Sequence, residues 1–452
     1  MSAASEKMRH EGLPPSAVAT FERYEERLRA GEGGMIPESE IEPLDDVPSL
    51  AGLPPGDESA LERVAVLKLN GGLGTSMGMT RAKSLLEVRD GLSFLDITVR
   101  QVLHLRERHG ARIPLLFMNS FATRDDTLAA LERYPQLPVD GLPLDFLQSR
   151  VPKLLADGYE PVSWPQDPSL EWAPPGHGEV FAALAAEGLL AELLEGGYEY
   201  LFLSNSDNLG GILEPRILAW FAAERLPFVS EVVDRTDGDK KGGHLARRRS
   251  DGHLLLRETA QVPDDDQAAF EDVSVHRYFN CNNIWVNLRA LDRTLAERDG
   301  VLELPMIVNR KTVDPSDAAS PEVVQLETAM GAAIGVFEGA GAVHSPRARF
   351  APVKKTNDLL VVRSDAYSLG DDWRLELAPE RDSTPPLVEL DSACFKLLDD
   401  FEARFSAGPP SLRACERLEV EGDVSFGRDV VVRGSVELRG PRRVADGEVL
   451  EG

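Results

Sequence analysis

The residues from Leu67 to Ser84, LKLNGGLGTSMGMTRAKS, have the composition of a backbone cradle for an anion. Glycines expose backbone N–H groups to a ligand, and nearby cations add positive charge. The glycines and cations of this stretch are Gly71, Gly72, Gly74, Gly78, Arg81 and Lys83. The stretch lacks the P-loop ending Gly-Lys-Ser/Thr, because Lys83 follows Ala82, and its G-x-G-x-x-x-G spacing is one residue longer than the dinucleotide fingerprint. It therefore predicts a phosphate-binding loop of a third kind.

The elements around this loop predict an α/β fold with a mixed, mostly parallel sheet. Apolar segments of strand length alternate with helical segments after residue 60. These segments lie at 64–69, 113–118, 200–204, 228–233 and 284–288. A capping box, Ser93 with Asp96, predicts the start of a helix after the glycine loop. The loop then lies at the carboxyl end of a strand, where ligands bind in open α/β sheets.

In the C-terminal residues the apolar side chains recur with a period of six residues. Apolar residues recur every sixth position at Leu418, Val424, Val430 and Val436, and a second set lies two places on at Val420, Phe426, Val432 and Leu438. This repeat predicts a short parallel β-helix, with an ordinary β-hairpin as the alternative. Its four units are too few to fold alone, so we expect them to pack on the rest of the chain or on another copy.

The composition limits the class of partner. A formal net charge of -27 argues against nucleic acid and anionic membranes, because both are polyanions. We find no signal peptide and no run of about 18 apolar residues, so we expect neither secretion by that route nor a membrane span. The three cysteines, Cys281, Cys394 and Cys415, are widely spaced and indicate neither a disulfide framework nor a metal cluster. A reducing, cytoplasmic location is expected.

The glycine loop resembles the signature loop of the eukaryotic-type UTP–glucose-1-phosphate uridylyltransferases, also called UDP-glucose pyrophosphorylases. Further blocks between about residues 60 and 440 are similar to that family in the same order. They are FLQSRVPKLL at 146–155, PPGHGEVFAAL at 174–184, SNSDNLGG at 204–211, KGGHLARR at 241–248, AQVP at 260–263, FNCNNIWVNL at 279–288, QLETAMGAAI at 325–334 and PVKKTNDLLVVRSD at 352–365. The ordered set is far more specific than one loop. One departure is TRAKS, where the family usually has a proline before the lysine.

The resemblance implies a Rossmann-like nucleotidyltransferase sheet followed by a short left-handed parallel β-helix. The expected division is an N-terminal helical region at 1–60, a catalytic domain at 61–365, and a linker with the β-helix at 366–452. The β-helix is the expected contact of a possible homo-oligomer.

The resemblance also assigns roles to individual residues. It places UTP at Leu69, Gly71, Gly72, Gly74, Lys83, Gln148 and Gly176. It places the sugar phosphate at His177, Gly243, Glu258, Asn280, Asn282, Asn283 and Lys354, without deciding which asparagines touch the sugar. Lys83 and Lys354 are the expected catalytic residues, and Asp207 is the expected ligand of the cofactor Mg²⁺. For His177 we favour contact with the ligand over proton transfer.

The implied reaction converts UTP and glucose 1-phosphate into UDP-glucose and pyrophosphate, without a covalent intermediate. Two alternatives remain at this point. One is uridylyl transfer to another sugar 1-phosphate, and the other is a UTP-binding or assembly module without turnover. A dehydrogenase is disfavoured because the glycine spacing is wrong for a dinucleotide.

Overall fold

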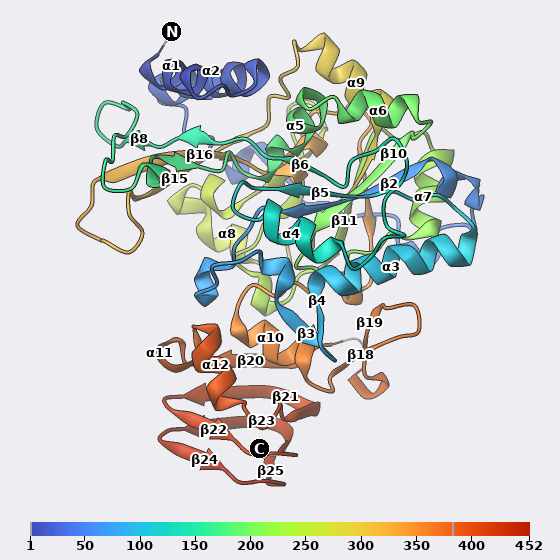
Figure 1. Cartoon of the computed structure of the whole chain (residues 1–452), viewed down its shortest axis with the longest axis vertical. Coiled ribbons are helices and arrows are strands. Elements are labelled where there is room, and N and C mark those ends of the chain that lie inside the picture. Colours follow the sequence, from blue (N-terminus) through green and yellow to red (C-terminus); the bar gives the residue numbers. More distant parts are fainter. Residues whose placement is uncertain (1, 382–383) are drawn as a thin grey trace.

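The computed structural model describes residues 2–381 and 384–452, and it is built around one large mixed sheet (Figure 1). Its parallel part consists of β10 (Tyr200–Asn205), β2 (Val64–Asn70), β5 (Leu115–Asn119) and β6 (Asp145–Leu147), in that order. The predicted strands 64–69, 113–118 and 200–204 are therefore confirmed to within two residues.

The other part of the sheet corrects the expectation of mostly parallel pairing. Strand β14 (Tyr278–Asn287) is antiparallel to β10 and also to β11 (Phe228–Asp234). β12 (His244–Arg248) is antiparallel to both β13 (Leu254–Arg257) and β14, and only β11 with β17 (Gly341–His344) adds a parallel pair. Burial makes a strand apolar whichever way it runs, so the apolar runs predicted the strands but not their directions.

Both faces of the sheet are buried, which explains the continuous apolar runs. In β2, Val64 and Val66 pack under α3 (Phe94–His109) and α7 (Pro215–Ala223). The alternate residues of β2 face the other side, where α5 (Val180–Ala186), α6 (Leu189–Glu195) and α9 (Leu288–Glu297) pack. Successive side chains of a strand point to opposite faces, so one strand supplies two cores.

The N-terminal residues are helical as expected, but they are also part of the main body. α1 (Ala3–His10) and α2 (Pro15–Arg29) bury Phe21, Tyr24 and Leu28 in an apolar cluster with β15 (Met306–Thr312) and β16 (Glu322–Thr328). After them, β1 (Ile41–Glu42) pairs with β12 at the edge of the large sheet.

The C-terminal strands form a parallel stack below the main body (Figure 1). β20 (Leu387–Leu390), β21 (Ser411–Glu421), β23 (Val431–Arg439) and β25 (Val449–Glu451) pair in that order, and β22 (Val424–Phe426) pairs with β24 (Arg442–Val444). Leu418 lies opposite Val436, 18 residues later, which is three six-residue repeats. Parallel pairing excludes the hairpin alternative.

All eight residues of the two predicted apolar sets are buried in this stack. Their cluster also includes residues of α10 (Thr356–Arg363) and of α3, so the apolar core of the C-terminal stack is continuous with that of the main body.

Smaller elements complete the described chain. They are β3 (Glu87–Arg89), β4 (Leu92–Ser93), α4 (Arg124–Leu131), β7 (Val151–Pro152), β8 (Leu154–Leu155), β9 (Trp172–Ala173), α8 (Gln267–Glu271), β18 (Tyr367–Leu369), β19 (Leu375–Leu377), α11 (Ser392–Phe395) and α12 (Leu398–Arg404).

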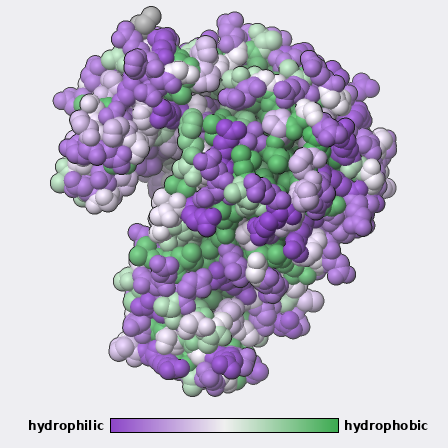
Figure 2. Space-filling view, viewed as in Figure 1, coloured by the Kyte–Doolittle hydropathy of each residue, from purple (hydrophilic) through white to green (hydrophobic). Residues whose placement is uncertain are grey.

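Hydrophilic residues cover most of the face shown in Figure 2, with apolar residues gathered in the middle of the body and toward the C-terminal stack. Among the described residues, no helix combines the length and the apolar character needed to cross a bilayer.

The capping box of α3 gives a test of the local structure. The Ser93 hydroxyl accepts a hydrogen bond from the Asp96 N–H at 3.2 Å, and the Asp96 carboxylate accepts one from the Ser93 N–H at 2.9 Å. Ser93→Ala should cost about 1 kcal/mol and lower the thermal unfolding midpoint by roughly 1–3 °C. Ser250→Ala, at an exposed turn, is the control and should leave the midpoint nearly unchanged. Equal midpoints for both variants would contradict the capping role.

Candidate functional site

The glycine loop leaves the carboxyl end of β2 and folds back on itself. Gly74 and Gly78 have φ values of 70° and 75°, a left-handed conformation that glycine adopts without strain. The Lys83 N–H donates to the Gly72 carbonyl at 3.0 Å, so Lys83 returns beside the glycines. Leu69 lies at the root of the loop, where its carbonyl accepts from the Ser206 N–H at 3.1 Å.

Lys83 and Asp207 meet at this edge of the sheet. β2 pairs in parallel with β10, so the loop after β2 and the Asp207 loop after β10 lie side by side. The Lys83 ammonium is 2.6 Å from the Asp207 carboxylate, and the two side chains are 15% and 20% exposed. The pair is therefore accessible to a ligand.

One carboxylate that is accessible beside a phosphate-binding loop fits Mg²⁺, which takes one or two carboxylates together with phosphate oxygens and water. Among the described residues, no group of three or more histidine, cysteine, aspartate or glutamate side chains is arranged to hold a metal ion. A divalent cation at Asp207 would thus depend on ligand phosphates for its remaining ligands.

Gln148 lies against the glycine loop. A Cβ added to Gly71 would come within 2.8 Å of the Gln148 Oε1, so only glycine leaves room for this amide. The Gln148 N–H donates to the Asn119 carbonyl at the end of β5, at 2.8 Å, which fixes its backbone. The amide has both a donor and an acceptor for a pyrimidine edge.

Gly176 and His177 lie before α5 and pack against the end of β16 and the residues that follow it. Gly176 has a φ of 81°, and a Cβ there would lie 2.4 Å from the Thr328 carbonyl oxygen. The His177 Nδ1 accepts a hydrogen bond from the Met330 N–H at 3.0 Å, so the proton of the neutral ring is on Nε2. Burial lowers the pKa of His177 to about 4. A neutral donor agrees with ligand contact rather than proton transfer.

Gly243, Glu258, Asn280 and Asn282 form a second cluster. Gly243 precedes β12, Glu258 follows β13, and the two asparagines lie near the start of β14. A Cβ on Gly243 would lie 2.6 Å from the Glu258 Oε2, and the Asn280 N–H donates to the Gly243 carbonyl at 3.1 Å. The Asn280 amide donates to Asn282 at 2.9 Å, and Asn282 has a φ of 55°. Burial raises the pKa of Glu258, and the positive charge of Lys354 opposes this rise. The charge of Lys354 therefore acts on this cluster.

Asn283 lies elsewhere, because its side chain faces the interior rather than this cluster. It is fully buried, donates to the Arg349 carbonyl at 3.1 Å and accepts from the Asn208 amide at 3.1 Å. Successive residues of β14 point to opposite sides, so the adjacent asparagines have different surroundings.

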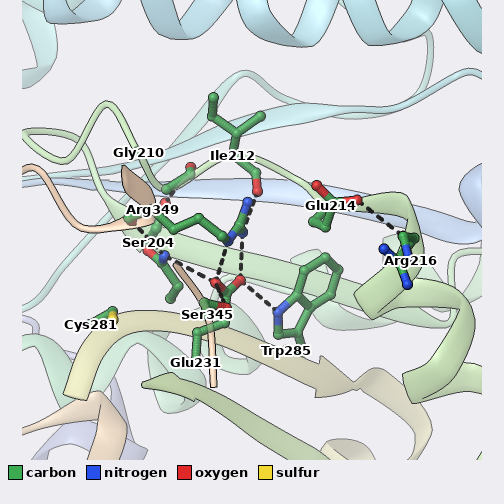
Figure 3. Close-up of polar contacts among 12 residues, drawn as sticks. Ser204, Gly210, Ile212, Glu214, Arg216, Glu231, Cys281, Trp285, Ser345 and Arg349 are labelled. Atoms are coloured by element: carbon green, nitrogen blue, oxygen red, sulfur yellow. Dashed lines mark hydrogen bonds and ion pairs between the residues drawn. The ribbon is translucent and has the colours of Figure 1, made fainter. Parts of the chain in front are cut away.

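A buried polar network beneath the site was missed from the sequence. Arg349 makes a two-point ion pair with Glu231, at 2.5 and 2.6 Å, and Trp285 and Ser345 also donate to that carboxylate at 3.1 and 3.0 Å (Figure 3). Arg349 further donates to the Ile212 carbonyl at 2.7 Å. The available signal was a glutamate in the middle of the apolar run FVSEVV, since a buried charge requires a partner.

Lys68 was missed in the same way. It is buried in β2, and its ammonium donates to the Ser204 hydroxyl at 2.7 Å and to the Gly211 carbonyl at 2.6 Å. Burial, together with the charge of Arg349, lowers the pKa of Lys68 to about 7. Lys68 thus holds the far end of the Asp207 loop against β2.

Glu179 connects the turn before α5 to the residue after Gln148. Its carboxylate accepts from the Ser149 N–H at 2.9 Å and from the Ser149 hydroxyl, next to Gln148. It lines a cavity of about 340 Å³ between α2 and α5, and burial raises its pKa to about 7.

The fold and site define a class of protein: an α/β protein with a glycine loop beside a lysine–aspartate pair and a separate cluster of polar residues. A family model described as UTP–glucose-1-phosphate uridylyltransferase matches residues 19–433, and the chain belongs to this family.

Named relatives agree with this membership. The UTP–glucose-1-phosphate uridylyltransferase of Hordeum vulgare is 41% identical over 94% of this chain and 90% of its own length. That of Solanum tuberosum is 41% identical over 91% and 86%. Among solved structures, a variant of UDP-glucose pyrophosphorylase from Leishmania major in complex with UDP-glucose aligns with a TM-score of 0.95 at 45% identity, covering 99% of this chain and 97% of that one.

The raised pKa of Glu179 gives a prediction on stability. Its ordinary value is 4.5, so between pH 4.5 and about 7 the folded chain keeps a proton that the unfolded chain has lost. The free energy of unfolding contributed by this group is present below pH 4.5 and is lost as the pH rises through 7. Glu179→Gln, which does not titrate, should therefore gain in thermal midpoint relative to the parent chain from pH 5 to pH 8.

The matched control for this series is Glu187→Gln, because Glu187 lines the same cavity but is exposed. Its midpoint should follow that of the parent chain at every pH. Parallel curves for the Glu179→Gln variant and the parent chain would show that Glu179 is ionised in both states.

Proposed function

We propose that this chain transfers a uridylyl group from UTP to glucose 1-phosphate, forming UDP-glucose and releasing pyrophosphate. The observation that carries the proposal is the meeting of Lys83 and Asp207, 2.6 Å apart, beside a glycine loop at the carboxyl ends of β2 and β10. The names of relatives about 40% identical over most of the chain support the same substrates.

The reaction follows from the charges of the substrates. An oxygen of the sugar phosphate attacks the α-phosphorus of UTP in line, the bond from that phosphorus to the bridging oxygen breaks, and pyrophosphate leaves with the electron pair. The attacking oxygen is already anionic at neutral pH, so no general base is needed. Catalysis then consists of positioning the substrates and neutralising their charge.

The residues divide this work between two sides of the site. On the nucleotide side, the glycine loop offers N–H groups, Lys83 offers a charge, and Gln148 offers an amide that reads the base. The neutral His177 would donate its Nε2 proton as a hydrogen bond to an oxygen of the sugar phosphate. On the sugar side, Glu258, Asn280 and Asn282 suit hydroxyl groups, and Lys354 adds the second cation.

Asp207 is the residue that would hold Mg²⁺. When bound, the ion would neutralise phosphate oxygens and fix their orientation. The Asp207 carboxylate faces the Lys83 ammonium in the structure, so it is oriented toward a positive charge at that position.

The test is pyrophosphate release from UTP with Mg²⁺, assayed in parallel with glucose 1-phosphate, galactose 1-phosphate and N-acetylglucosamine 1-phosphate, and with ATP replacing UTP as a control. We expect strong release only with UTP and glucose 1-phosphate. Release with a different sugar would support the alternative acceptor, and the assignment of glucose specificity to the Glu258 cluster would then be wrong. Binding of UTP without release in any mixture would support the non-catalytic module.

Two glycines allow the two sides of the site to be tested separately. In Gly71→Ala the new Cβ displaces the Gln148 amide, so the KM for UTP should rise about tenfold with that for glucose 1-phosphate little changed. In Gly243→Ala the Cβ displaces the Glu258 carboxylate, so the KM for glucose 1-phosphate should rise instead. Both backbones lack a positive φ, and both displaced groups are ends of flexible side chains, so the fold should persist.

Each of these variants is the control for the other, and steady-state kinetics with each substrate varied in turn is the measurement. Equal effects of both variants on both KM values would contradict the division of the site.

We also infer a left-handed β-helix for the C-terminal stack, from the 18-residue offset of its parallel pairs, with self-association through it. A cytoplasmic location is part of the proposal, supported by three cysteines that are free in the structure.

A further inference from the structure

Asn208 lies next to the proposed metal ligand Asp207, but its own side chain points away from solvent and is 2% exposed. Its amide nitrogen donates to the Arg349 carbonyl and to the Asn283 side chain, both at 3.1 Å. Its amide oxygen accepts from the Gly210 N–H at 3.2 Å and from the Ala351 N–H at 2.9 Å. An amide offers two donor hydrogens and two acceptor positions, so every one is used.

These bonds join the Asp207 loop to the segment that leads into Lys354. Arg349 and Ala351 are each bound by the Asn208 amide, and the Val353 N–H donates to the Asp207 carbonyl at 3.2 Å. The segment therefore lies antiparallel to the loop, with Asn208 opposite Pro352. Lys354 is the next residue after the last of these contacts.

The far side of the segment is also held. The Arg349 side chain is fixed by its two-point ion pair with Glu231, shown in Figure 3, and cannot follow a displaced backbone without breaking it. Beyond Lys354, the Asp358 carboxylate accepts from the Lys354 and Lys355 N–H groups at 2.7 and 2.9 Å, at the start of α10. The backbone of Lys354 thus has a fixed place relative to the Asp207 loop.

We infer that Asn208 is a positioning residue that sets the distance between the Asp207 carboxylate and the Lys354 ammonium. This inference rests on the proposed function, because the two groups it relates are the proposed metal ligand and the proposed phosphate-binding cation. Asn208 itself is buried, and its amide is hydrogen-bonded to protein groups. It acts by joining two loops that come from sequence positions more than 140 residues apart.

The first experiment is Asn208→Ala in the full chain, assayed with UTP, glucose 1-phosphate and Mg²⁺. The kcat should fall by about tenfold or more, since small displacements of catalytic groups have effects of this size. The KM for UTP should stay within about threefold, because no hydrogen bond of the described chain joins Asn208 to Gln148 or the glycine loop. A uniform loss of folded protein would instead reduce the active fraction and leave both KM values unchanged, so the active-site concentration is measured in parallel.

A double-substitution cycle separates positioning from a general structural effect. If Asn208 acts by placing Lys354, Asn208→Ala should have only a small further effect on kcat in a chain that already carries Lys354→Ala. Residual rates are followed with radiolabelled UTP. Equal fold-losses in the two backgrounds would overturn the inference.

Ser5→Ala is the matched control, because Ser5 is also buried and hydrogen-bonded, but its described side-chain bonds are to Ser2 and Arg9 at α1. The control substitution should change kcat by the same factor in the parent chain and in the Lys354→Ala variant. If Asn208→Ala does not fold, Asn208→Ser is used instead, because its hydroxyl can replace part of the four hydrogen bonds of the amide. It should lose less kcat than Asn208→Ala and show the same dependence on Lys354. An unchanged kcat in either folded Asn208 variant would refute the positioning role.

Activity of the parent chain distinguishes failure of the proposed function from failure of the positioning role. Absence of pyrophosphate release by the parent chain would refute the proposed function. An active parent chain with additive Asn208 and Lys354 effects would refute only the positioning role.

Discussion

The parallel pairing of β2 with β10 is the contact on which the site depends. Because the two strands run the same way, the glycine loop and the Asp207 loop leave the sheet at the same edge. An antiparallel neighbour would place the carboxylate at the opposite end of the strand, roughly 20 Å away for a strand of this length. Lys83, Asp207 and the glycines therefore converge as a result of strand direction, and side-chain contacts only refine their positions.

The buried network below this edge adds precision at an energetic cost. Removing the Glu231 and Arg349 charges from water is unfavourable, and hydrophobic residues of similar volume could fill the same space with no loss of stability. An ion pair with two-point geometry, however, fixes orientation in a way that apolar packing does not. Its carbonyl and amide neighbours then hold the loops on either side. We interpret the network as a source of fixed geometry rather than of stability.

The sequence predicted the strands of the parallel part, the helix after Ser93 and the C-terminal six-residue repeat, because each depends on local spacing of apolar residues or on a local cap. It did not predict the antiparallel direction of β14, since strand direction depends on connections that the apolar pattern does not record. The Asp207 and Lys83 assignments came from ordered blocks, and the structure brings these two side chains together.

The residues that sequence reasoning missed share a physical cause. Lys68, Asn208 and Arg349 act through partners that lie far away in the chain, so no short motif contains the interaction. Asn283 was grouped with Asn280 and Asn282 because a motif gives spacing but not the side of the strand that each residue faces. Long-range contacts and side-chain direction are properties of the tertiary structure, so they are seen only in the folded chain.

The 18-residue offset between paired C-terminal strands has a consequence for length variation. Successive turns of the stack pair with one another at this fixed offset, so a whole turn can be inserted or deleted without changing the register of the remaining pairs. Insertions of a length that is not a multiple of six would shift the apolar set out of the core, because the apolar residues recur every six positions. The length of the C-terminal stack can thus change in steps of one turn, while the large sheet with the site stays the same.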